Sequence, residues 1–151
     1  MARTVYLQRI GNALYPSDGL SDSDLSDIPS GKRVKAVITE PRRQKPHRLY
    51  WAVLKIVSEN TEHPVLSDRD QLHNLVKIKC GIVHVVRSQK TGELFQLPGS
   101  IAFDKMDQME FRAFLDKALA FLCDEVIPGL GVADLEEQAR QMIGEKQANA
   151  A

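Results

Sequence analysis

Positively charged side chains gather between Lys32 and Lys55, and they are the strongest chemical signal in the sequence. This window holds eight Lys and Arg residues but one acid, Glu40, although the whole chain of 151 residues is formally neutral. The cations run into Tyr50 and Trp51 at the start of an expected helix. Cations beside flat aromatic rings suit a phosphate backbone with unstacked bases. The pattern favours a nucleic-acid-binding surface.

The candidate binding residues lie in a basic loop and in the first turns of the helix that follows it. They are Arg42, Arg43, Lys45, His47, Arg48, Tyr50 and Lys55. Arg48 and Lys55 are two helical turns apart, so they share a face about 10 Å apart. Two other interpretations stay open: Tyr50 and Trp51 pack into the core while the cations only solubilise the surface, or the basic surface binds an acidic protein segment.

Other residues with catalytic or metal-binding chemistry do not form a recognisable motif. Zinc sites usually have ligands in close pairs, and the four histidines have none beside them. Asp68 and Asp70 are close together, but a helix cap explains them. Cys80 and Cys123 lie far apart among apolar neighbours, which predicts buried free thiols in a reducing cytoplasm. We expect no enzyme activity, no metal and no cofactor.

The composition predicts one soluble globular domain over residues 1–151. The chain is 43% hydrophobic and 26% charged, and no apolar run approaches the roughly 18 residues that span a bilayer. The first residues lack the long apolar core of a secretory signal. We therefore expect a cytoplasmic protein without membrane contact.

Hydrophobic periodicity and turn residues predict the elements that must position these side chains. Expected strands cover residues 4–10, 32–40, 82–87 and 93–97, with a short extended piece at 100–106. Expected helices cover residues 47–62, 67–80, 107–127 and 134–144. Residues 16–31 read as an acidic loop and 145–151 as a frayed tail. This order predicts an α+β fold, with a small, mainly antiparallel sheet and helices packed on one side.

Acidic side chains concentrate in the last third of the chain. Residues 104–151 hold ten acids and five bases. An acidic half beside a basic half permits two interpretations: a self-complementary dimer contact, or scattered solvated faces.

Two stretches resemble phage-encoded proteins. The first, PRRQKPHRLYWAVLKIVSENTE, is a basic loop followed by an aromatic helix start, and it resembles the NinB and Orf recombination proteins of lambdoid phages. The second is similar to a phage and prophage family of unknown function, in which a P-x-S-I-S-F-x-x-M-D-x-x-E-F pattern opens the last long helix. The matching residues are Pro98, Ser100, Ile101, Phe103, Met106, Asp107, Glu110 and Phe111, with Ala102 where the family often has Ser. This second resemblance covers residues 32–129.

Resemblance to NinB and Orf implies an α+β homodimer that binds single-stranded DNA and assists recombination together with a single-strand-binding protein, without chemistry of its own. It carries over to the basic loop and helix start, namely Arg42, Arg43, Lys45, His47, Arg48 and Tyr50. The chain differs from NinB after Glu62, which leaves the dimer mode open. The expected function is therefore non-catalytic binding of single-stranded DNA in phage recombination or replication. The alternative is an interaction adaptor that uses the basic surface at 32–55 without nucleic acid.

Overall fold

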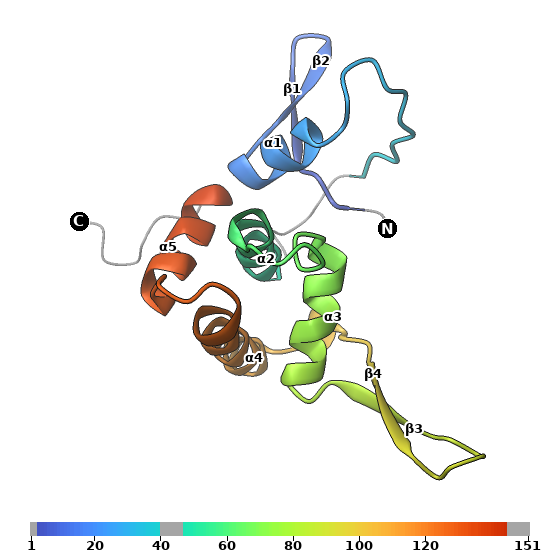
Figure 1. Cartoon of the computed structure of the whole chain (residues 1–151). Coiled ribbons are helices and arrows are strands. Elements are labelled where there is room, and N and C mark those ends of the chain that lie inside the picture. Colours follow the sequence, from blue (N-terminus) through green and yellow to red (C-terminus); the bar gives the residue numbers. More distant parts are fainter. Residues whose placement is uncertain (1–2, 40–46, 145–151) are drawn as a thin grey trace.

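Helix α2 (Arg48–Asn60) lies at the centre of the protein, and four further helices surround it (Figure 1). A computed structural model describes residues 3–39 and 47–144, apart from the side chain of Asp104. The other helices are α1 (Gly19–Ser26), α3 (Arg69–Lys79), α4 (Gln108–Phe121) and α5 (Val132–Met142), with a 3-10 turn η1 (Phe103–Lys105) before α4 and a π-helical turn η2 (Leu122–Val126) after it. The predicted α+β class is confirmed. Within the described ranges, no helix is long and apolar enough to cross a bilayer.

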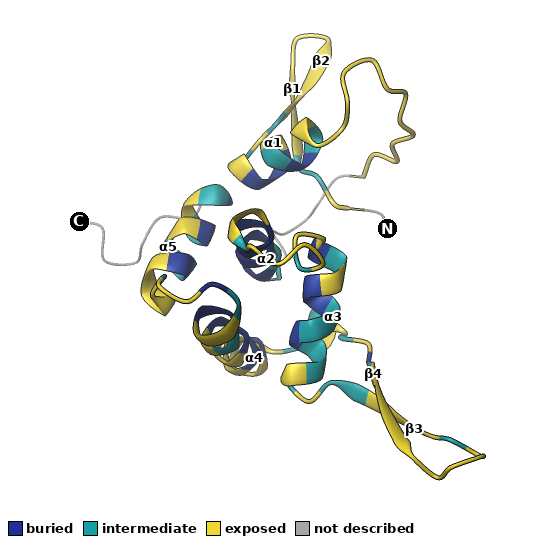
Figure 2. Cartoon of the chain, in the orientation of Figure 1, coloured by how far each residue is buried: buried dark blue, intermediate teal, exposed yellow. Residues whose placement is uncertain are grey.

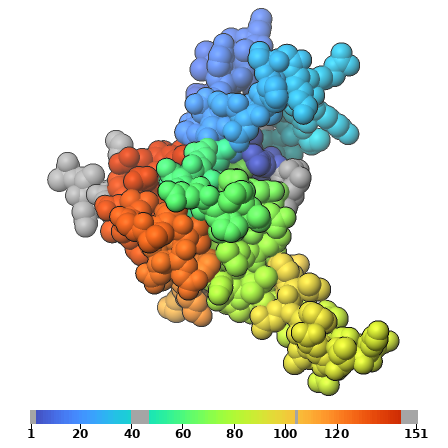
Figure 3. Space-filling model, in the orientation of Figure 1, coloured from blue at the N-terminus to red at the C-terminus, as the bar shows by residue number. Residues whose placement is uncertain are grey.

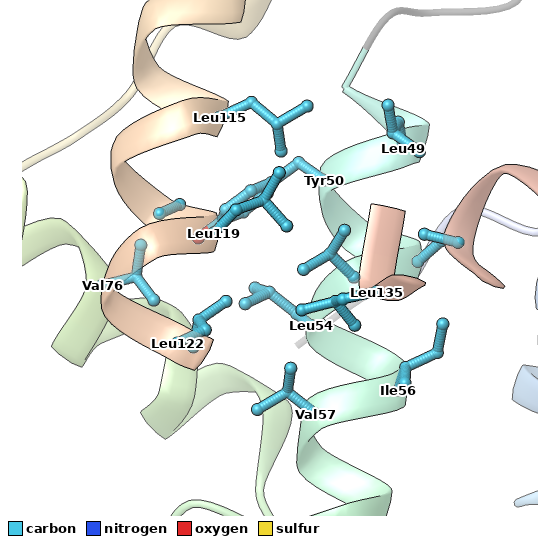
Figure 4. Close-up of a cluster of buried hydrophobic side chains, with 14 of the residues drawn as sticks. Leu49, Tyr50, Leu54, Ile56, Val57, Val76, Leu115, Leu119, Leu122 and Leu135 are labelled. Carbon is cyan, nitrogen blue, oxygen red and sulfur yellow. The ribbon is translucent and has the colours of Figure 1, made fainter. Parts of the chain in front are cut away.

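The hydrophobic core lies between α2 and the helices packed on it. Tyr50, Leu54 and Val57 of α2 face Leu119 and other residues of α4, as the close-up in Figure 4 shows. Val76 of α3, together with Leu115, Leu122 and Leu135, closes the cluster. Each fully buried Leu or Val of this kind contributes about 1.5–3 kcal/mol to folding. The apolar residues predicted along the central helix therefore do form the core.

The strands form two separate antiparallel hairpins rather than one sheet. Strands β1 (Leu7–Ile10) and β2 (Ala13–Pro16) pair at one end of the molecule, and β3 (Val83–Arg87) and β4 (Leu94–Pro98) pair at the other (Figure 1). The β3–β4 hairpin was predicted with its short loop, whereas β2 lies mostly between the expected strand at 4–10 and the expected loop at 16–31, where no strand was predicted. Most residues of both hairpins are exposed (Figure 2).

Three local predictions are wrong. The acidic loop at 16–31 contains α1, because the Asp18 carboxylate accepts a hydrogen bond from the Ser21 amide at 2.8 Å and so caps a helix. Residues 32–39 form no strand: they are exposed, and no strand of the described chain pairs with them. The extended piece at 100–106 contains the turn η1 instead. The predicted tail at 145–151 lies outside the described residues.

The helix boundaries follow from their end residues. The Asp107 carboxylate accepts a hydrogen bond from the Glu110 amide at 2.7 Å and opens α4, as the sequence predicts. Asp68 caps α3, and its carboxylate accepts a hydrogen bond from the Asp70 amide at 2.9 Å. Gly81 ends α3 at φ +83°, a left-handed conformation that costs glycine no steric strain.

Candidate nucleic-acid interface

Arg48, a predicted DNA contact, is buried beneath the N-terminal segment. Its guanidinium pairs with the carboxylate of Asp18, the cap of α1, and lies 3.3 Å from the Ser21 hydroxyl. It also lies 4.0 Å from the centre of the Tyr6 ring, a cation–π distance. The side chain is 5% exposed. Arg48 is therefore neutralised by protein groups and is not available to a phosphate.

Lys55, the second cation on that helix face, is buried in the same way. Its ammonium pairs with Asp24 at 3.4 Å, with Glu59 at 3.4 Å and with Asp27. The hydrogen bond from Lys55 lowers the pKa of the Asp27 carboxyl. Asp24 also holds Arg69 of α3 at 3.0 Å. Asp24 in α1 and Asp27 at the end of α1 thus connect this helix to α2 and α3 through ion pairs.

The prediction that Arg48 and Lys55 share a face is correct, but the prediction that this face meets solvent is wrong. The apolar residues of α2 cover more than half of its surface, so most of the helix is buried, including the stripe with the two cations. A buried cation is tolerated only with a nearby anion, because desolvating an unpaired charge costs several kcal/mol. Helix α1 supplies those anions.

Tyr50, predicted as a stacking platform for bases, belongs to the core. Its side chain is fully buried, and its hydroxyl is hydrogen-bonded to Nδ1 of His73 at 2.7 Å. Burial raises the pKa of Tyr50 and lowers the pKa of His73 to about 4, so both groups are neutral at pH 7. Tyr50 therefore cannot reach a nucleic acid.

His47 and Trp51 extend this aromatic cluster towards the surface. The His47 ring is half-buried and stacks on Phe103, with 5.4 Å between ring centres. Trp51 is half-buried against the core, and its ring centre lies 4.7 Å from that of His73. Trp51 serves packing, as the sequence suggested, and His47 stands at the edge of the same cluster.

The remaining predicted cations, Arg42, Arg43 and Lys45, lie outside the described residues. The segment that leads into them is described over residues 32–39, and each of its side chains is exposed. Lys32, Arg33 and Lys35 make no ion pair with any residue that the structure describes. Among the described residues, this segment is the exposed part of the predicted basic surface.

A second group of exposed cations was missed by the sequence analysis. It consists of Lys79 at the end of α3 and of Arg87 and Lys90 on the β3–β4 hairpin. All three are exposed, and none makes an ion pair within the described ranges. The signal was present, because residues 71–92 contain no Asp or Glu. It was overlooked because these cations are spread over a helix end and a hairpin rather than grouped in one loop.

Groups suited to metal or thiol chemistry do not gather near either set of cations. Among the described residues, no three His, Cys, Asp or Glu side chains converge as metal ligands. Cys80 and Cys123 are not bonded to each other, and burial raises the pKa of both thiols. A cavity of about 730 Å³ lies between residues 60–64 and 126–130 and is lined by none of the predicted binding residues.

Comparisons of the chain with known protein families, with curated proteins and with solved structures find no match.

Proposed function

We propose that this chain is a non-catalytic phage or prophage protein that binds single-stranded DNA in recombination or replication, in the manner of the NinB and Orf proteins. The binding surface is the basic segment 32–45, which comprises Lys32, Arg33, Lys35, Arg42, Arg43 and Lys45. One observation carries the proposal: every residue of 32–39 is exposed, and the three cations among them form no ion pair with any described residue.

The exposed basic residues at 32–39 suit a single strand for a physical reason. Lys and Arg contacts release counterions from the phosphate backbone, and this release provides affinity without sequence recognition. The β1–β2 hairpin lies at the same end of the molecule and adds exposed Arg9 and Tyr15 (Figure 2). A tyrosine ring with half its surface exposed offers a face on which a base can stack. Tyr15 replaces buried Tyr50 in this role.

The same proposal assigns the protein a setting and partners. It would work in the cytoplasm of the bacterial host, next to a single-strand-binding protein that shares the DNA. It would act as a homodimer, as the resemblance to NinB and Orf implies.

Charge reversal tests the binding surface directly. Replacing Lys32, Arg33 and Lys35 together by Glu should lower affinity for a fluorescent 20-nucleotide single strand at least tenfold, measured by anisotropy at 50 mM salt. The logarithm of the parent's association constant should fall by about 0.7 per phosphate contact for each tenfold rise in salt concentration. The variant should lose most of this salt dependence. Reversal of Arg42, Arg43 and Lys45 should have a similar effect.

The matched control reverses three exposed lysines elsewhere: Lys79, Lys105 and Lys117. It makes the same change in net charge, so a purely global electrostatic effect would weaken binding equally in both variants. Equal weakening, or parent-like affinity in the first variant, contradicts the assigned surface. Circular dichroism of each variant confirms that the fold is intact.

An interaction adaptor is the second candidate, and exposed apolar side chains favour it. Three apolar residues lie between or just after these cations in the sequence: Val34, Val37 and Ile38. Each is more than half exposed. A segment of this composition also suits an acidic, partly apolar protein surface. The adaptor predicts salt-sensitive association between proteins and no change on adding oligonucleotide, which sedimentation with and without DNA distinguishes.

A further inference from the structure

Helix α1 attaches the N-terminal part of the chain to the helical body with little apolar contact. The β1–β2 hairpin and the residues after α1 project from one end of the body (Figure 3). The buried residues of α1 are Leu20, Ser21 and Asp24, of which Leu20 alone is apolar. Residues 28–39 are all exposed. Parts of a protein with few buried apolar contacts are those that open most easily.

Beneath α1 lies a row of three buried cations, which we call the covered stripe: Arg48 and Lys55 of α2, and Arg69 of α3. Lys55 and Arg69 approach the same Oδ1 atom of Asp24, at 3.4 Å and 3.0 Å. Arg48 pairs with Asp18, one helical turn and a half earlier on the same helix. Each carboxylate thus lies where an oxygen of an anionic ligand can bind.

Helix α1 satisfies these cations incompletely. The Nε donor of Arg48 is buried and has no hydrogen-bond acceptor among the residues that the structure describes, while Nη2 donates to Asp18 and Ser21. A phosphate group carries several acceptor oxygens and binds a guanidinium through two parallel hydrogen bonds. A phosphate in the place of Asp18 can therefore satisfy Arg48 more fully than α1 does.

The ionic character of this contact suits it to opening. Buried ion pairs contribute little net stability, because the cost of desolvating both charges offsets their attraction. When α1 leaves, the cations of the covered stripe regain water. An apolar contact face would instead be exposed as a patch prone to association. The contact is therefore one that can open and close in water.

We infer that α1 is a releasable cover over a second strand-binding surface, formed by Arg48, Lys55 and Arg69. Its ligand is the phosphate backbone of a single-stranded nucleic acid, so the inference rests on the proposed function and deepens it. While α1 is in place, the segment 32–45 alone is open to a strand. This segment joins α1 to α2, so a strand bound to it lies close to the covered stripe once α1 leaves.

Leu20→Asn tests the cover without changing any charge, since it replaces the buried apolar side chain of α1 by a polar one. Lys55 reports the release. Its acetylation by an N-hydroxysuccinimide ester, followed by mass spectrometry, should be at least tenfold faster in Leu20→Asn than in the parent. Exposed Lys79 is the internal reference and should react equally in both proteins. A 20-nucleotide single strand should then slow acetylation of Lys55 at least fivefold in the variant, but not that of Lys79.

Affinity provides a second measurement with a matched control. Leu20→Asn should bind the same strand at least fivefold more tightly than the parent, measured by anisotropy at 50 mM salt. Adding Arg48→Gln and Arg69→Gln should remove this gain. Adding Lys79→Gln and Lys117→Gln instead makes the same change in net charge at exposed positions and should keep the gain. Amide exchange in α4 should match the parent throughout, because release of α1 leaves the core folded.

Four results overturn the inference: Lys55 stays unreactive in Leu20→Asn, the strand leaves a reactive Lys55 unprotected, affinity stays at the parent's value, or α4 exchanges as fast as α1. The proposed function is decided by charge reversal at residues 32–35 in the parent, and this inference by the difference between Leu20→Asn and the parent. Binding at 32–45 with no gain on release therefore removes only this inference. A strand that protects Lys55 in the variant, without binding at 32–45 in the parent, removes only the assigned surface of the proposed function.

Discussion

His73 is a base kept neutral inside the protein. It is buried against Tyr50 and Trp51, and burial lowers its pKa from 6.5 to about 4. Between pH 6.5 and 4 the unfolded chain takes up a proton at this residue while the native protein does not. Stability is therefore at its full value above pH 6.5 and is lost as the pH falls towards 4, by about 2–3 kcal/mol for a group this buried.

Replacing the imidazole by a group that does not titrate isolates this effect. In His73→Asn the free energy of unfolding in urea should be lower at pH 7, because the hydrogen bond to Tyr50 is lost. It should then change much less than in the parent between pH 6.5 and 4.5. Exposed His63 offers a control for the substitution itself, since His63→Asn should leave the free energy of unfolding at pH 7 close to the parent's. Parallel curves for His73→Asn and the parent would show that His73 titrates normally.

The placement of single cations shows what the sequence could and could not predict. That Arg48 and Lys55 share a helix face follows from their spacing alone. Whether that face is buried depends on a contact with α1, about 30 residues earlier in the chain, which no local pattern encodes. The apolar coverage of α2 nevertheless held the clue, because a mostly buried helix can keep cations only where acids meet them.

Helix α1 is held by ion pairs as well as by one core residue, Leu20. Its buried residues are Leu20, Ser21 and Asp24, and Asp24 pairs with both Lys55 and Arg69. Asp24→Asn should cost about 3 kcal/mol of unfolding free energy, because two buried cations lose a charged partner. Asp22→Asn, on the exposed side of the same helix, should cost less than about 0.5 kcal/mol. Urea titrations of both variants measure the difference, and equal values would show that the ion pairs do not hold α1.

The elements were predictable where one face met a large apolar core. Helices α2, α4 and α5 follow from their apolar spacing, and the β3–β4 hairpin follows from a β-branched run and a second apolar run around a short polar loop. Helix α1 was missed because its anchor is a buried ion-pair network, and hydrophobic periodicity cannot detect ion pairs. Residues 32–39 alternate like a strand, but strand formation requires a partner edge, and alternation does not show whether one is present.

The whole molecule carries its two groups of exposed cations at opposite ends of the helical body (Figure 1). The basic segment follows the β1–β2 hairpin and α1, whereas Lys79, Arg87 and Lys90 lie at the end of α3 and on the β3–β4 hairpin. A short oligonucleotide therefore reaches one group, and only a longer strand can reach both.

This arrangement predicts that the gain in affinity from a longer strand comes from the segment 32–45 alone. Binding at a second site becomes intramolecular once a strand spans both sites, which can raise overall affinity by a factor of about 100 or more. Replacing Lys79, Arg87 and Lys90 together by Glu should therefore leave the ratio of the affinities for a 60-nucleotide and a 10-nucleotide strand like that of the parent, because the proposed binding surface does not include them. Anisotropy titrations with both lengths measure this ratio. If the variant lowers the ratio tenfold or more, the second group of cations also holds the strand, and the binding surface is not confined to the segment 32–45.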